Sequence, residues 1–376
     1  MRTTVAYVLV IGLAACSSGV PVEPPIGAAP DAGGGPPVGS TDAPTTTPPP
    51  PPPIDAGVEI PIDATVGGPL VPPTRGFQII GPTIDIDPHA DITWCFYFET
   101  KNIDQLAIQS WESRMTPGAH DMIVYLTSSN LKTPGTLANS GCGFAGGIAH
   151  QRWTYAAQTD AATGTLPTSA AFATATLPAD DGTGTPVAQL VKGKQAGFIQ
   201  MHFVNPSDAA IQAHVELNGY AYGAGVAVTA AAPFVTYNTM ISLLPGSAVA
   251  PKPGFVEGSC AVAAGAKFFQ MTTHTHKQGV HALVQDALLP DADPSAPKVF
   301  ESLSWERPGE QTWTAAPFLS FASGKLSYRC EYMNPTTSQI FDGDRPAADE
   351  TCMAVGFFFP AVNGEGHLCI DNNLFY

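Results

Sequence analysis

The segment Phe198-Ile-Gln-Met-His-Phe-Val204 alternates as a β-strand does, with Ile199, Met201 and Phe203 on one face and His202 on the other. Comparable short apolar runs recur between glycines and prolines. They cover residues 94–98, 122–126, 213–222, 268–273, 326–332 and 352–359. This spacing favours an all-β protein built of antiparallel sandwiches over helical bundles or βαβ units. Residues 101–115 are compatible with either a helix or a strand.

The composition divides the chain into a linker and a folded part. Residues 17–75 consist mainly of proline, glycine, alanine and threonine, with a proline run at 48–53. Such a segment buries too little apolar surface to fold, so we expect a disordered linker with a stiff polyproline II section. The remainder, about 300 residues, exceeds one typical core. We therefore predict two tandem jelly-roll-like sandwich domains, 76–231 and 232–376, with their junction within 223–234.

The first sixteen residues have the pattern of a bacterial lipoprotein signal. Arg2 precedes an apolar run that is too short to span a bilayer, and Leu13-Ala-Ala-Cys16 provides small residues before a cysteine. We expect cleavage before Cys16 and lipidation of this residue. Ser17, in place of an aspartate, predicts an outer-membrane lipoprotein of the cell envelope, periplasmic or surface-exposed. An ordinary cleaved secretory signal is the alternative.

The charge balance limits the possible partners. The chain has 16 basic and 32 acidic residues and a formal net charge of −16. This sign repels nucleic acid and anionic lipid, so we expect no nucleic-acid binding and membrane contact through the lipid anchor only. Metal cations and neutral or cationic small molecules remain plausible ligands. We expect a monomer.

A His-x-His pair provides the first candidate metal ligands. His274 and His276 are two residues apart in an apparent strand, so their side chains leave the same face about 7 Å apart and can chelate one ion. The alternative is a solvated or hydrogen-bonded pair with no metal. The order of further landmarks favours a metal. These landmarks are Cys95, Gly118-Ala-His-Asp-Met122, Cys142, His202, Cys260, Cys330-Glu-Tyr-Met-Asn334, Gly343, Asp349-Glu-Thr-Cys352 and Cys369.

This ordered set resembles the copper type II, ascorbate-dependent monooxygenases, the family of peptidylglycine α-hydroxylating monooxygenase and dopamine β-monooxygenase. The resemblance covers residues 76–376. It implies up to two copper ions, one in each domain, facing each other across an open cleft. It assigns His120 and His202 to the first copper, which supplies an electron, and His274 and His276 to the second, which binds dioxygen and substrate.

Two ligand positions depart from the family pattern. Asp121 stands where the family has a second histidine, and Thr351 stands where it has a methionine. Asp121 could ligate through oxygen or accept a hydrogen bond from a histidine ligand, the role we favour. Ligation by both His120 and Asp121 requires a bulge in the strand. Met353 could replace the missing thioether, but packing with Val355 and its apolar neighbours is the simpler interpretation.

The remaining histidines are interpreted as surface or locally hydrogen-bonded residues. They are His89, His150, His214, His281 and His367. His281, five residues after His276, is the one we would test as an additional ligand.

Six cysteines remain after Cys16, which is an even number consistent with three disulfides in an exported protein. Spacing alone allows fifteen pairings. The resemblance implies three bridges: Cys95–Cys142, Cys260–Cys369 and Cys330–Cys352. No pair has the Cys-x-x-Cys spacing typical of a cysteine metal site.

Three functions follow as hypotheses. The first is hydroxylation of a C–H bond of a small apolar or cationic substrate, with dioxygen and electrons from ascorbate or another reductant. Met271, Thr272 and Thr273 stand where peptide-hydroxylating members place an arginine, so a peptidylglycine substrate is not supported. The second is a non-catalytic copper-binding surface lipoprotein. The third is an adhesion or structural protein on the same fold.

Overall fold

The computed structural model describes residues 68–140, 151–159, 165–289, 295–343, 345 and 348–375. These residues lie within one compact unit, Ile62–Tyr376. The described part consists of β-strands and one short 3-10 turn, Val362–Gly364, with no α-helix. The expected all-β class is therefore confirmed. The ambiguous segment 101–115 contains a strand, Leu106–Met115.

Among the described residues, the first half of this unit, up to residue 228, contains twelve strands. They are β1 (Gly76–Ile80), β2 (Ile84–Ile86), β3 (Asp91–Glu99), β4 (Leu106–Met115), β5 (Ala119–Thr127), β6 (Leu137–Ala138), β7 (Gln151–Gln158), β8 (Ala171–Thr176), β9 (Val187–Val191), β10 (Ala196–Val204), β11 (Ile211–Ala213) and β12 (Val215–Ala221).

Twelve further strands follow in the second half. They are β13 (Thr229–Tyr237), β14 (Ser242–Leu243), β15 (Lys252–Ala261), β16 (Lys267–Thr275), β17 (Gly279–Asp286), β18 (Lys298–Ser302), β19 (Gln311–Thr312), β20 (Lys325–Asn334), β21 (Ile340–Phe341), β22 (Cys352–Phe359), β23 (His367–Ile370) and β24 (Asn373–Phe375).

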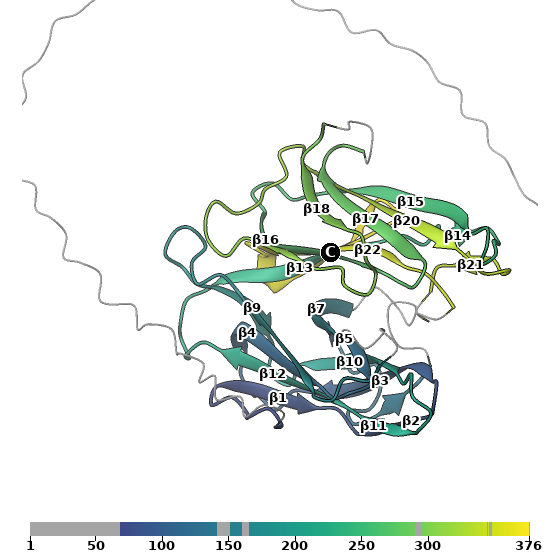
Figure 1. Ribbon diagram of the computed structural model, residues 1–376. Helices are drawn as coiled ribbons and strands as arrows, with labels where there is room; N and C mark the ends of the chain where they lie inside the picture. Colours follow the sequence, from purple (N-terminus) through teal and green to yellow (C-terminus); the bar gives the residue numbers. More distant parts are fainter. Residues whose placement is uncertain are drawn as a thin grey trace, which may run out of the picture. The chain divides into compact units, whose positions relative to one another are not determined.

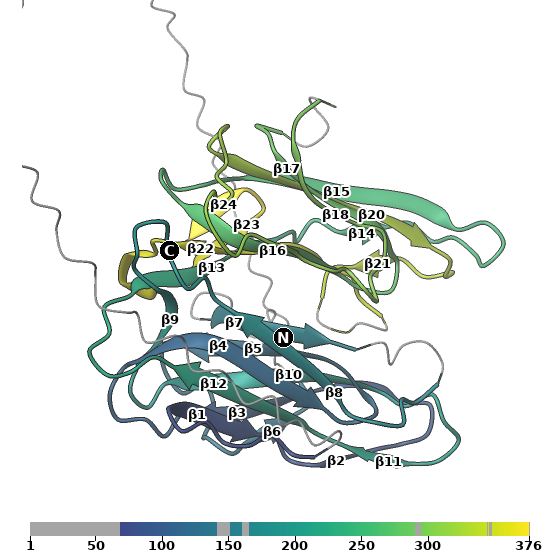
Figure 2. The same ribbon diagram turned by 60° about the vertical axis from the view of Figure 1, so that its left-hand side comes forward.

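The strands form three main sheets, which Figures 1 and 2 show from two directions. A five-stranded sheet has the order β6-β3-β10-β5-β7. An eleven-stranded sheet runs along the path β1-β12-β4-β9-β13-β22-β16-β19. A four-stranded sheet, β15-β20-β17-β18, lies over β13, β22 and β16 in Figure 2.

Strand β13 joins the two halves of the unit. Its residues Thr229–Ala231 pair in parallel with β9, and Ala232–Val235 pair antiparallel with β22. The expected boundary between residues 231 and 232 therefore falls inside a strand and not in a loop. Because backbone hydrogen bonds continue across this position, one sheet extends through both halves.

Strand β22 separates two hydrophobic cores. Its side chains alternate, as in any strand. Met353, Val355 and Phe357 belong to the core of the first half, whereas Ala354 and Phe358 belong to the core of the second. Both faces of β22 are buried, and the strand is apolar throughout for that reason.

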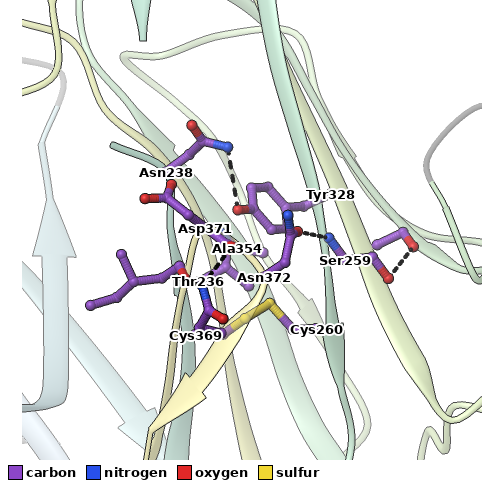
Figure 3. The surroundings of a disulfide bond; sticks show 12 residues. Thr236, Asn238, Ser259, Cys260, Tyr328, Ala354, Cys369, Asp371 and Asn372 are labelled. Carbon is purple, nitrogen blue, oxygen red and sulfur yellow. Dashed lines mark hydrogen bonds between the residues drawn. A yellow bond between two sulfur atoms is a disulfide. The ribbon is translucent and has the colours of Figure 1, made fainter. Parts of the chain in front are cut away.

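Two of the expected disulfides are present. Cys260–Cys369 and Cys330–Cys352 both lie in the core of the second half. Figure 3 shows Cys260–Cys369 among polar residues that tie the surrounding strands together; Ser259 there donates its backbone N–H to Asn372 at 2.7 Å. Cys95 is also disulfide-bonded. Its expected partner, Cys142, lies outside the described residues.

The folded part begins before the expected boundary at residue 75. Leu70 is buried, and its backbone N–H donates to the Glu216 carboxylate at 2.7 Å. The carbonyl of Val71 accepts from Asn218 at 2.8 Å. Residues 68–75 are thus held against β12, while the rest of the expected linker and Cys16 lie outside the described residues. No helix in the described part is long and apolar enough to cross a membrane.

Candidate metal centre

A β-bulge brings His120 and Asp121 to the same site. In the ladder between β10 and β5, His202 lies opposite Asp121, and Phe203 lies opposite Ala119. His120 is therefore an extra residue in β5, which is the bulge that joint use of both side chains requires. One ligand atom from each of His120, Asp121 and His202 lies within 4.8 Å of the other two.

His202 is held between two carboxylates. Its Nδ1 lies 2.9 Å from Oδ2 of Asp121, and its Nε2 lies 2.7 Å from Oδ1 of Asp91. Burial opposes protonation of the ring, but the charge of Asp121 and the two hydrogen bonds raise the pKa of His202 to about 9. Burial also raises the pKa of Asp121, yet the His202 cation overcomes this effect and holds that pKa well below its usual range.

His120 presents a bare ring nitrogen to this cluster. The ring is fully buried, and its Nδ1 donates to the Thr159 carbonyl at 3.1 Å. Because a carbonyl can only accept, the proton of the neutral ring is on Nδ1 and Nε2 carries a lone pair. No hydrogen-bond partner of this Nε2 is found in the described part of the chain. Desolvation lowers the pKa of His120, so the ring is neutral.

The rings of the His-x-His pair are neutral like that of His120, and His276 likewise carries its proton on Nδ1. The rings of His274 and His276 are perpendicular, with centroids 5.2 Å apart. Nδ1 of His276 donates to the Asp349 carbonyl at 3.0 Å, which leaves its Nε2 as the lone-pair nitrogen. His274 has no hydrogen bond to any described residue. Desolvation lowers the pKa of His274 and lowers that of His276 to about 3.

Glu350 fixes the backbone at the end of the pair. Its fully buried carboxylate accepts the backbone N–H of His276 at 3.0 Å and that of Gln278 at 2.5 Å. Burial raises the pKa of Glu350 to about 8 despite these bonds. The chain leaves β16 here, and the carboxylate sets the direction in which the His276 ring projects.

Histidines from both halves line one small cavity. This cavity has a volume of about 30 Å³, and its walls include Asp121, His202, His274 and His276. The resemblance implied instead two centres separated by an open cleft. In this structure β5 and β10 face the end of β16 closely, and Asp121 contributes to the electrostatic environment of all four histidines.

Thr351 and Met353 also line this cavity. Oγ1 of Thr351 is buried and has no hydrogen-bond partner in the described part of the chain. Met353 lies directly opposite His274 in the ladder of β16 and β22, so both side chains leave the same face. Met353 both packs in the core of the first half and lines the cavity. The two roles proposed for it are therefore compatible.

The other histidines lie elsewhere. His281 is bonded to Glu301 at 2.9 Å and Glu331 at 3.3 Å on the four-stranded sheet, so it is not an additional ligand here. His89 pairs with Asp208, and His214 pairs with Glu216. His367 packs against Phe234 and Phe358. His150 lies outside the described residues.

Sequence reasoning missed three residues at the site. Asp91 begins β3 and reaches His202 across the ladder. Trp153 on β7 has its ring centroid 6.1 Å from that of His274. Trp305, from the second half, has its ring centroid 5.8 Å from that of His120. No sequence signal identifies these three residues, because the Asp91 contact depends on the register of β3 against β10 and the two tryptophan contacts depend on packing between the halves.

The chain matches no protein-family model and no curated protein. Comparison with solved structures finds similarity to the PBSX exported protein XepA, at 7% identity over 77% of this chain and 89% of that chain, with a TM-score of 0.21. A structure of broad bean stain virus has 10% identity, coverage of 82% and 98%, and a TM-score of 0.27. A triple jelly roll structure of an archaeal virus has 9% identity, coverage of 76% and 59%, and a TM-score of 0.18. These values carry no argument about function.

Proposed function

We propose that this protein binds copper and acts as a reductant-dependent monooxygenase, of the kind that its sequence resembles. The observation that supports this proposal is the proximity of four histidines: His202, His274 and His276 line one small cavity, and His120 lies in one cluster with Asp121 and His202. Desolvation keeps His120, His274 and His276 neutral. Water cannot solvate these rings as it does at a surface, and the Nε2 atom of His120 lacks a partner in the described part of the chain. A bound cation would satisfy such nitrogens.

The donor set suits copper. Neutral imidazoles bind copper in either oxidation state, and a thioether such as that of Met353 favours Cu(I). Carbonyls at Thr159 and Asp349 hold the Nδ1 protons of His120 and His276, the usual outer-shell arrangement for histidine ligands. His202 could bind only after losing its proton and its contact with Asp91, so copper binding at that side releases a proton.

Copper held here would supply the electron transfer and dioxygen activation that C–H hydroxylation needs, with ascorbate or another reductant as electron source. The residues of the chain orient the histidines that would hold the copper and shield the metal from water. Asp91 and Asp121 fix the His202 ring, and Glu350 fixes the backbone of His276. Burial of the cavity excludes bulk water from the reacting volume.

A second candidate is a copper-binding lipoprotein without catalysis. It is favoured by Thr351, because a hydroxyl is a weak ligand for Cu(I), the form that meets dioxygen. The two carboxylates on His202 also favour Cu(II) over Cu(I) in that region. For either candidate we propose a cell-envelope location through lipidated Cys16.

Copper analysis tests the proposal. Purified protein is loaded with copper, desalted and analysed for metal, alongside the double variant His274→Ala, His276→Ala. A matched control is His89→Ala, His281→Ala, because both of those histidines pair with carboxylates away from the cavity. We expect most copper to be lost in the first double variant and retained in the second. Equal copper content in wild type and in the first variant would reject the proposal.

Oxygen uptake then separates the two candidates. Copper-loaded wild type and the two double variants are given ascorbate, and dioxygen consumption is recorded with catalase present. Uptake by the wild type and the control, absent from the cavity variant, supports the monooxygenase. Intact copper binding with no uptake in any protein would leave the non-catalytic binder.

A further inference from the structure

A larger cavity adjoins the metal centre. Its volume is about 380 Å³, and it shares Asp121, Trp153 and His274 with the small cavity. Its walls come from β7 and β8 of the first half and from β16, β22 and residues 306–310 of the second. A cavity of this size is within the range that holds small-molecule ligands.

The walls of this cavity combine polar side chains with a larger apolar surface. Trp111, Phe269, Val355 and Phe357 are all buried and line it. On β8 the lining side chains are small, with Ala173 and Ala175 facing the space. Large aromatic rings and small side chains thus line the same space, a combination that suits a flat apolar body.

Several polar side chains in these walls are bonded to other protein groups. Trp111 Nε1 donates to Gln189 at 2.5 Å, and Gln189 donates to the Thr154 carbonyl at 3.2 Å. The Tyr155 hydroxyl is 2.8 Å from the Ser113 hydroxyl. Because these groups are bonded to one another, an apolar ligand would not deprive them of hydrogen bonds.

The charged groups around the cavity disfavour anions. Glu306, Glu310 and Asp121 line the cavity together with Arg307. Carboxylates thus outnumber the single guanidinium, on a chain whose formal net charge is −16. A ligand carboxylate or phosphate would be repelled here.

Segment 306–310 is held by one hydrogen bond from the first half and one from the second. Gln158 on β7 donates to the carbonyl of Glu306 at 2.7 Å. Thr272 on β16 donates to the carbonyl of Gly309 at 2.6 Å. Segment 306–310 is therefore tied on both sides, and the cavity is formed before any ligand enters it.

We propose that this cavity binds an apolar small molecule with a flat ring body and no anionic group, positioned beside His274 and Trp153. The claim that this molecule is the substrate of the copper centre rests on the proposed function. The claim that it binds in the cavity does not. The preference for an apolar ligand and the exclusion of anions follow from the residues that line the cavity alone.

Calorimetric titration of the metal-free protein, prepared with a chelator, tests this inference. The probes are 1-naphthalenemethanol and 1-naphthoate, which share a ring system and differ in charge. We expect the alcohol to bind at least about tenfold more tightly than the carboxylate. Equal affinities, or no binding of the alcohol, would overturn the inference.

Cavity-filling variants locate the binding. Ala175→Phe places a ring in the cavity and should weaken binding of the alcohol at least about tenfold. Ala173→Leu should also weaken this binding. Ala171→Phe is the matched control, since it lies on the same strand but does not line the cavity. Unchanged binding in both filling variants, with their thermal unfolding intact, would also overturn the inference.

The two proposals fail separately. Binding of the alcohol by a protein that holds no copper would reject the metal proposal and leave the cavity inference standing. Copper binding without binding of the alcohol would reject the cavity inference and leave the metal proposal standing.

Discussion

Asp121 and His202 lie opposite each other on neighbouring strands, and the 2.9 Å contact between Oδ2 and Nδ1 joins them. This contact gives Asp121 the role of a carboxylate that orients an imidazole. A histidine at position 121, as in the resembled family, would supply a third ring but no such acceptor. Aspartate at this position therefore determines what holds the His202 ring.

Asp121→Asn should weaken copper binding roughly 10- to 100-fold, the usual effect of removing an outer-shell carboxylate from a histidine ligand. The amide retains the shape but loses the charge. Competition with a copper chelator measures the change. Asp208→Asn is the control, because Asp208 forms the same kind of pair with His89 at the surface. An Asp121→Asn protein with wild-type affinity would contradict this role.

Thr351→Met should increase Cu(I) affinity, because it replaces a buried hydroxyl that has no partner in the described residues by a soft thioether. Any ascorbate-driven oxygen consumption should rise with it. Met353→Leu should lower Cu(I) affinity while leaving Cu(II) binding nearly unchanged. A Cu(I)-specific chromophoric chelator measures both. If Met353→Leu has no effect on Cu(I), Met353 serves the core alone.

The two described disulfides should differ in their effect on stability. They close loops with sequence separations of 109 for Cys260–Cys369 and 22 for Cys330–Cys352. Loop-closure entropy predicts losses of about 5 and about 3 kcal/mol when each pair is replaced by alanine. Urea unfolding at equilibrium measures both losses. A larger loss for the shorter loop would show that packing in the core dominates.

His367 should make the free energy of unfolding depend on pH. Its ring packs against Phe358 with centroids 4.8 Å apart, and burial lowers its pKa below the ordinary value. The unfolded chain therefore binds a proton that the folded chain resists, so stability falls as pH drops through about 6.5. His367→Phe should reduce this fall. Urea midpoints at about pH 5 and about pH 8 test it, and identical differences in both proteins would exclude a contribution from His367.

Cys16→Ala should release the protein from the membrane fraction, because two acyl chains or more are needed for stable anchoring and this cysteine is the expected site of lipidation. Fractionation with detection of the chain in the soluble and membrane pools measures the result. Ser17→Ala serves as the control. A Cys16→Ala protein that stays in the membrane pool would rule out the lipid anchor.

Local patterns determined the all-β class. Short alternating runs such as 198–204 identify strands because side chains alternate between two faces at every residue. The same rule placed His274 and His276 on one face. It also indicated that His120 and Asp121 could act together only through a bulge, and the ladder between β5 and β10 contains that bulge.

The tertiary structure decided which residues meet. Sequence order cannot show that Asp91 reaches His202, because that contact depends on the register of β3 against β10. It cannot show that Trp153 lies beside His274, because these residues belong to different halves of the unit. The candidate histidines could therefore be identified from the sequence, whereas their proximity in the fold depends on long-range strand pairing and on the packing of both faces of β22.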